Sequence, residues 1–195
     1  MLRKSLIALW CSFNTLCFGQ EKDSIISSSK WFIPDGVSAQ FAGGVGMVSA
    51  GILYKTSEKT DFTISAGYVP PKFGRIFTIN AFGTYHPLQV KLCKQTEWNV
   101  LNAGIFVSSA IGNNIYIKWP EYYPRKYYWW NSSIRYGPFL ESEIKYNLPG
   151  SESSCSLFFQ ANTNDLYLSV YFHSTNAVKL SEILVFGTGL RVWFN

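Results

Sequence analysis

The residues best suited to chemistry lie close together near the C-terminal end of the chain. His173 is followed directly by two hydroxyl side chains, Ser174 and Thr175, and the carboxylate of Glu182 comes shortly afterwards. In hydrolases a carboxylate orients a histidine, which takes the proton of a hydroxyl that then attacks an ester. These residues are therefore the candidate catalytic group, with either hydroxyl as the nucleophile.

The same inventory argues against metal and cofactor chemistry. The chain has only two histidines, His86 and His173, so a metal site built on imidazole is not expected. Two of its four cysteines fall in the N-terminal segment discussed next. The remaining pair, Cys93 and Cys155, is enough for one disulfide bridge and too small for a disulfide framework or a zinc site. We expect no metal and no cofactor.

The N-terminal segment predicts export. Residues 1–19 join two early positive charges to a mostly apolar run that ends in small residues, which is typical of a secretory signal peptide. Residues 20–36 are polar and serine-rich and are expected to be a periplasmic leader. No later run reaches the roughly 18 apolar residues of a spanning helix. Any insertion into a membrane would therefore have to use strands.

The last segment, 182–194, alternates as a strand with one apolar face. That face holds Leu184, Phe186, Thr188, Leu190, Val192 and Phe194, and the other holds Gly187, Gly189 and Arg191. In a soluble sandwich the apolar face would point inward. In an outer-membrane barrel it points outward, and the small and charged side chains fill the lumen.

Residues 134–148 repeat this pattern with more charge. One face is mostly apolar, and the other carries Arg135, Glu141, Glu143 and Lys145. The segment exceeds the five or six residues of a usual strand and suits a tilted membrane span of about nine to eleven residues plus its rim. We expect these charges to form a lumen network with Arg191, in which Arg191 is the counter-charge of Glu141 or Glu143.

The whole pattern predicts an all-β fold, an antiparallel transmembrane β-barrel of eight strands over residues 37–195. Glycines at 43–46 favour a turn over a bulge between the first two strands. With both termini in the periplasm, the turns near 57, 88 and 149 are expected on that side. The predicted strands are 37–45, 48–56, 61–69, 75–86, 98–110, 132–147, 155–173 (one long strand or two) and 182–194.

Aromatic residues make up 17% of the chain, more than a soluble core of this size needs, and membrane barrels use them in interfacial girdles. An aromatic-rich soluble sandwich remains the alternative. Residues 111–130 are predicted to be an outer loop that packs on the barrel rim or the lipid interface; ligand binding is the second interpretation of this loop. Its candidate contact residues are Tyr122, Tyr123, Tyr127, Tyr128, Trp129 and Trp130.

The charge of the chain does not point to nucleic acid. The formal net charge is +5, and Arg3 and Lys4 would leave with the signal peptide. No basic run and no strip of interleaved basic and aromatic residues is present, so a nucleic-acid partner is not expected.

Several motifs resemble small outer-membrane barrel proteins of Bacteroidota. The likeness covers nearly all of the chain after the signal peptide and implies a barrel, but its motifs are structural and imply no activity. The motifs are Tyr68-Val69-Pro70 with Gly74, Tyr127-Tyr128-Trp129-Trp130, Ile134-Arg135-Tyr136-Gly137-Pro138-Phe139, Thr163-Asn164-Asp165-Leu166-Tyr167-Leu168 and Gly187-Thr188-Gly189-Leu190-Arg191.

The segment from His173 to Glu182 loosely resembles outer-membrane lipid A deacylases. In these eight-stranded barrels a histidine and a serine two residues later lie on one strand, and a glutamate on the next completes the triad. Thr175 holds the nucleophile's position here, and Ser174 is one residue off. Alternation over 155–173 places His173 toward the lumen, whereas the deacylase triad faces the lipid it cleaves.

Two functions follow as expectations. The first is a small outer-membrane barrel, exported through the Sec pathway, with a structural, accessory or surface-binding role and no diffusion pore, because side chains fill an eight-stranded barrel. Its partners would be outer-membrane lipid, the barrel-assembly machinery during biogenesis, and another barrel or a surface ligand. The alternative is a lipid A deacylase-like esterase.

Overall fold

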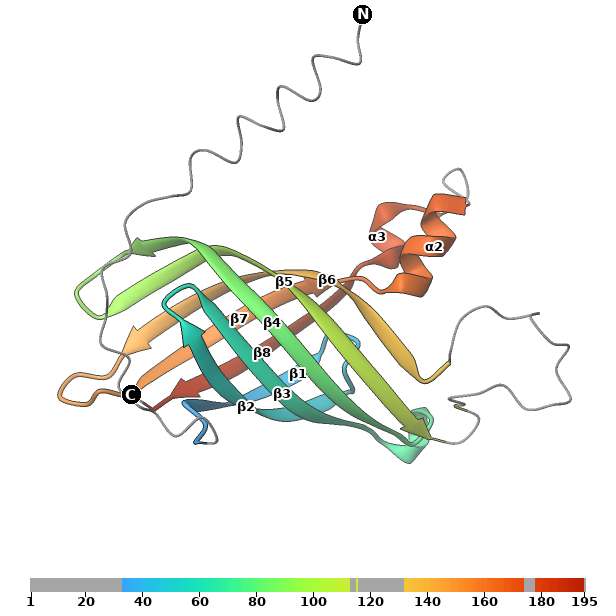
Figure 1. Cartoon of the computed structure of the whole chain (residues 1–195), viewed down its shortest axis with the longest axis horizontal. Coiled ribbons are helices and arrows are strands. Elements are labelled where there is room, and N and C mark those ends of the chain that lie inside the picture. The colour runs from blue at the N-terminus through green and yellow to red at the C-terminus, as the bar shows by residue number, and fades with distance from the viewer. Residues whose placement is uncertain (1–32, 113–114, 116–131, 174–177, 195) are drawn as a thin grey trace, which may run out of the picture. The chain divides into compact units, whose positions relative to one another are not determined.

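The computed structural model describes residues 33–112, 115, 132–173 and 178–194. This part of the chain forms a closed barrel of eight antiparallel strands, in which each strand pairs with the next and β8 pairs with β1 (Figure 1). The predicted all-β fold, a barrel of eight antiparallel strands, is confirmed. The elements are β1 Gly36–Ala42, β2 Val48–Ser57, β3 Thr60–Val69, η1 Pro71–Phe73, β4 Ile76–Lys91, β5 Thr96–Gly112, β6 Ile134–Asn147, β7 Ser154–Asn162, α2 Asp165–His173, α3 Leu180–Ile183 and β8 Val185–Trp193.

Three predicted features lie wholly or largely outside the described residues. They are the signal peptide at 1–19, most of the leader at 20–36, and the aromatic loop residues from Tyr122 to Trp130.

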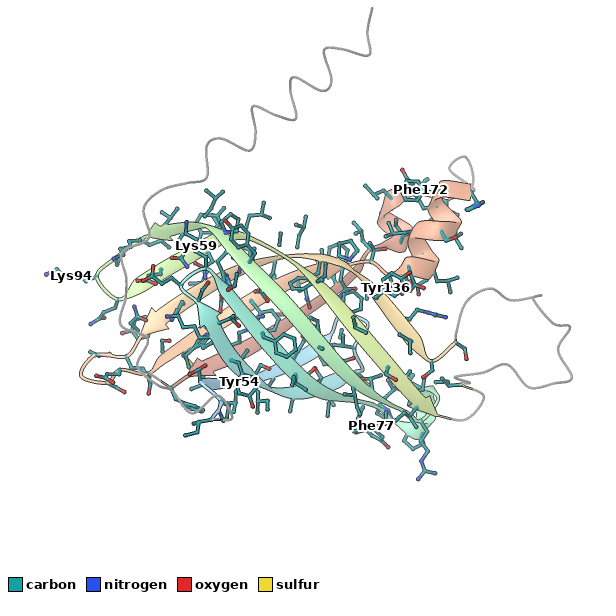
Figure 2. All side chains as sticks on the ribbon, in the orientation of Figure 1. Tyr54, Lys59, Phe77, Lys94, Tyr136 and Phe172 are labelled. Carbon is teal, nitrogen blue, oxygen red and sulfur yellow. The ribbon has the colours of Figure 1, made fainter. Side chains whose placement is uncertain are left out.

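The two ends of the barrel differ in their connections. At one end, called the terminus end, the first and last strands meet, and the Phe194 amide donates to the Asp35 carbonyl at 2.6 Å. The short turns after β2, β4 and β6 also lie there. The opposite end, called the loop end, carries residues 43–47, η1, α2 and α3. Figure 2 shows Lys59 and Lys94 at the terminus end, and Phe77 and Tyr136 toward the loop end.

Side chains alternate between a polar inside and an apolar outside along the strands. On β6, for example, Leu140 and Ile144 are exposed, while Glu141 and Glu143 are buried in the lumen. The outward apolar side chains form a surface that we call the apolar belt. Its main members are Ile52, Phe62, Ile64, Phe77, Ile79, Leu101, Ile105, Val107, Leu140, Ile144, Leu157, Phe159, Phe186 and Leu190.

The first connection folds back into the barrel. The chain leaves β1 at Ala42 and begins β2 at Val48, so the predicted turn at the glycines is confirmed. Val45, in the middle of this turn, is fully buried. A side chain on Gly67 would overlap the Val45 carbonyl, so the absence of a side chain at that position on β3 lets the turn enter the lumen.

The prediction of strand over 155–173 is wrong beyond Asn162, where β7 ends and α2 soon follows. Alternating Leu166, Leu168, Val170 and Phe172 imitate a strand. However, the Asn164 side chain accepts the Tyr167 amide at 2.9 Å, which is the usual contact of a helix N-cap and favours helix after it.

Two other predicted strands have different ends. β4 continues past Pro87 to Lys91, and the pairing of β4 with β5 shifts register between Tyr85 and Leu88. An irregularity of this kind tolerates a proline, which has no amide to donate. The predicted strand 182–194 begins later, because α3 occupies its first residues.

Candidate functional site

The centre of the lumen is an ion cluster built on Arg191 of β8. Its guanidinium donates to both carboxylate oxygens of Glu141 on β6, at 2.7 Å each. A second carboxylate, that of Glu143, lies 3.5 Å from the same guanidinium. All three side chains are buried. A planar guanidinium matches a carboxylate in this two-point geometry, so the contact is directional as well as electrostatic.

Neutral side chains complete the hydrogen bonding of the two glutamates. Asn102 donates to Glu141 at 3.2 Å and Asn99 donates to Glu143 at 3.0 Å, both from β5. The Ser156 hydroxyl of β7 also donates to Glu143. These partners come from both neighbours of β6, so the cluster joins four consecutive strands. Satisfying the remaining lone pairs is what makes buried carboxylates tolerable.

An aromatic ring packs against the guanidinium of Arg191. The guanidinium carbon of Arg191 lies 4.1 Å from the centre of the Phe158 ring, a cation–π distance. A side chain at Gly189 would approach that ring to about 2.5 Å. The glycine at this inward position of β8 therefore leaves room for the Phe158 ring.

A second ionisable pair lies nearer the terminus end. His86 Nε2 and the Asp61 Oδ2 carboxylate oxygen are 2.6 Å apart, and both side chains are buried. The sequence pattern predicted no contact between these two residues. The register of β3 with β4 sets Asp61 opposite Thr84, which brings these side chains together. No local sequence signal announces such a pairing.

The loop-end half of the lumen contains an apolar cluster. Val45, Phe82, Phe106 and Phe139 form a buried cluster. The Phe82 ring lies 5.8 Å from the Phe139 ring in an edge-to-face arrangement and 6.0 Å from the Phe106 ring, distances that favour aromatic packing. The Val45 carbonyl accepts hydrogen bonds from Thr78 and Asn80, so the turn that carries Val45 is fixed in place.

Between the ion cluster and the apolar cluster almost no empty space remains. The gap next to Phe82, Phe158 and Arg191 has a volume of about 10 Å³. Since a single water needs about 10 to 15 Å³ of such volume, this gap holds one water at most. The described lumen therefore offers no path for a solute, as expected for a barrel of this strand number.

Each end of the barrel opens into a cavity. The terminus-end cavity has about 270 Å³ and polar walls that include Lys55, Asp61, His86 and Glu143. The loop-end cavity is larger, about 630 Å³, and mostly apolar. Its apolar lining includes Met47, Val69, Phe73, Ile76, Phe106, Ala110, Tyr167 and Val185.

The predicted lumen network is divided in the structure. Glu141, Glu143 and Arg191 are in contact, as described above. Arg135 lies on the wall of the loop-end cavity, donates to the Ile134 carbonyl and is 3.9 Å from the Asp165 carboxylate. Lys145 lies on the wall of the terminus-end cavity, with its ammonium group 5.7 Å from the centre of the Trp193 ring.

Two of the candidate catalytic residues, His173 and Glu182, lie on helices. His173 ends α2, and its Nδ1 contacts the Ser169 carbonyl at 2.8 Å. Glu182 belongs to α3 and accepts the Lys179 amide at 3.0 Å. Ser174 and Thr175 lie outside the described residues, as do the six aromatic loop residues. Both placed members of the candidate group are thus engaged with backbone of their own segments.

Three further findings concern metals, disulfides and helices. Among the residues that the structure describes, no group of three or more histidine, cysteine or acidic side chains is arranged to hold a metal ion. Cys93 and Cys155 are both free and exposed, so the possible bridge between them is not formed. None of the helices in the described ranges is both long and apolar enough to cross a membrane.

Comparison with known proteins adds no relative: no protein-family model, curated protein or solved structure matches this chain.

Proposed function

We propose that this protein is an integral barrel of a Gram-negative outer membrane that binds an apolar ligand at its loop end. The observation that carries the membrane assignment is the inverted distribution of side chains. Large apolar residues such as Ile105 and Phe186, 69% and 65% exposed, cover the outside. The charged side chains of Asp61, Glu141, Glu143 and Arg191 are buried inside. A water-soluble barrel would place these two classes the other way round.

The height of the apolar belt supports this assignment. Exposed tyrosines flank it on β6, with Tyr136 toward the loop end and Tyr146 toward the terminus end. At about 3.3 Å per residue and a tilt of about 40°, the distance between them along the barrel axis is about 25 Å. That is the usual height of the apolar band in outer-membrane barrels, where aromatic girdles mark both interfaces.

One polar residue on the outer face of β6 is also accounted for. Ser142 interrupts the apolar belt, and its hydroxyl accepts a hydrogen bond from the Trp98 indole at 3.0 Å. In hydrocarbon an unpaired hydroxyl would be costly, so this pairing fits a lipid-facing position.

The binding role rests on the loop-end cavity. With the lumen closed, the protein acts through its ends and outer wall. The cavity volume of about 630 Å³ lies in the range of about 300 to 1,000 Å³ that small-molecule sites occupy. Its buried polar residues bond within the protein: Thr78 to Val45, Ser108 to Asn80 and Asn162 to Gly43. The walls therefore best complement an apolar molecule.

The membrane assignment is tested in cells and in detergent. When the protein is expressed in a Gram-negative host, it should fractionate with the outer membranes. Its strands should resist added protease there, and it should migrate faster on a denaturing gel when it is not boiled. Recovery of the folded chain in the soluble periplasmic fraction would refute the assignment.

The binding role is tested with a fluorescent apolar probe, 1-aminoanthracene, added to the protein in lipid nanodiscs, with empty nanodiscs as the blank. We expect saturable binding that is lost in Ala110→Trp, which fills the cavity, and kept in Leu88→Trp, a matched change at the terminus end. Binding that is equal in both variants, or no saturable binding at all, would contradict the loop-end site.

A further inference from the structure

Helix α2 has a wide apolar face, and none of its side chains is fully buried. Six of its nine residues are leucine, valine, tyrosine or phenylalanine. Phe172 is 71% exposed, and Val170 and Tyr167 are exposed as well. The three remaining residues of α2, Asp165, Ser169 and His173, are spaced by four residues and form one narrow polar face. A helix normally places a wide apolar face against protein or membrane. The described part of this protein does not enclose α2.

The helix is nevertheless fixed to the barrel wall. β7 ends opposite Phe139 of β6, so the rest of that β6 edge needs other partners. The Thr163 amide donates to the Pro138 carbonyl at 3.3 Å, and Asp165, the first residue of α2, accepts the Tyr136 amide at 3.4 Å. The start of α2 is thereby held against the outer end of β6, beside Tyr136.

This attachment makes α2 a continuation of the apolar belt. Tyr136, which flanks the belt beside the start of α2, is exposed, and so is Phe186, the belt residue on β8 that follows α3 along the chain. Leu180 of α3 is exposed too. Figure 1 shows α2 and α3 beyond the strands at the loop end of the barrel, and Figure 2 labels Phe172 on this helical segment.

We infer that α2, with Leu180 of α3, is a lipid-binding element that lies in the interface of the membrane leaflet at the loop end. A helix with a wide apolar face and a narrow polar face suits the plane of a membrane interface, and α2 adjoins the apolar belt, which is the surface proposed to contact lipid. The exposed polar side chains His173, Lys179 and Glu182 are then available to headgroups. This inference rests on the proposed membrane location and is independent of the cavity.

The test measures what surrounds single side chains in lipid vesicles. Nitroxide labels are attached to Phe172→Cys, Leu140→Cys and Lys94→Cys in a protein whose four native cysteines are replaced by serine. Collision with oxygen, which concentrates in lipid, is compared with collision with a water-soluble nickel chelate. Leu140 lies in the middle of the apolar belt and Lys94 in the turn after β4, so these two labels are the lipid and water references.

We expect the label at position 172 to collide with oxygen several-fold more than with the nickel chelate, as at position 140. A ratio like that at position 94 would overturn the role of α2 while leaving the membrane location intact. Shielding from both agents would also overturn it, because a second copy or another protein would then cover the helix. If the label at position 140 were itself in water, the membrane location would fail.

Discussion

Arg191 and Glu141 join two strands that are not neighbours. β7 lies between β8 and β6 in the sheet. The two hydrogen bonds of 2.7 Å from Arg191 to Glu141 pass over the inner face of β7. The backbone ladder already fixes each strand to the next one. The Arg191 cluster adds a cross-connection inside the barrel, which backbone hydrogen bonds cannot make.

This relationship predicts a large loss of stability in Arg191→Met. The change leaves the carboxylates of Glu141 and Glu143 buried without their cation, and removing one partner of a buried ion pair costs about 3 to 5 kcal/mol. Reversible urea unfolding in lipid vesicles measures the free energy of unfolding. The matched variant Lys145→Met should lose about 1 kcal/mol or less, because it removes only a cation–π contact at the barrel mouth.

The same pair can be isolated by a double-mutant cycle. Glu141→Gln combined with Arg191→Met should cost less than the two single changes added together, by about 0.5 to 3 kcal/mol, because each single change leaves a buried charge behind. Strict additivity would mean that the contact between Arg191 and Glu141 contributes nothing specific to stability.

The depth of the apolar belt gives a second prediction. Leu140 lies near the middle of the belt, so Leu140→Arg should destabilise the protein in lipid by about 2 to 4 kcal/mol, whereas a change near an interface should cost about 0 to 1 kcal/mol. Leu88→Arg, at an exposed position close to the terminus end, is the matched control. Equal losses in the two variants, measured by unfolding in the same vesicles, would speak against a membrane-spanning belt.

The strands that carry the strongest alternation were predictable from sequence. β6 and β8 each place apolar side chains at every second position, which is the period of a β-strand. The same alternation predicts that Glu141, Glu143 and Arg191 point inward. The contact between Arg191 and the glutamates was expected for the same reason. Burying three charged side chains inside one barrel leaves few other partners for them.

The remainder depended on information that alternation does not contain. After β7, apolar residues alternate from Leu166 to Phe172 as they would in a strand. The segment is a helix instead, and the Asn164 side chain makes the N-cap contact that favours it. The pairing of Asp61 with His86 required the register of β3 with β4. Burial of Val45 required a close approach at Gly67. Each of these is a contact between parts of the chain whose spacing shows no periodic signal.

The buried pair of Asp61 and His86 yields a third prediction. In His86→Ala the Asp61 carboxylate loses its 2.6 Å partner, and leaving a buried acceptor unpaired costs about 1 to 3 kcal/mol or more for a charged group. Adding Asp61→Asn to this variant should recover part of the loss. The control is His173→Ala, at an exposed position, which should leave the free energy of unfolding unchanged. A loss as large in the control would show that the lumen pair has no special role.

The candidate catalytic group gives the last prediction, which concerns lipid A. The imidazole Nδ1 of His173 contacts a carbonyl of its own helix, and the carboxylate of Glu182 accepts an amide of its own turn. An ester hydrolase instead needs the carboxylate to orient the histidine and the histidine to reach a hydroxyl. We therefore expect expression of the protein to leave the acylation of lipid A unchanged, as measured by mass spectrometry of extracted lipid A. Loss of one acyl chain with the wild type, absent with His173→Ala and with Thr175→Ala, would contradict this expectation and establish the esterase.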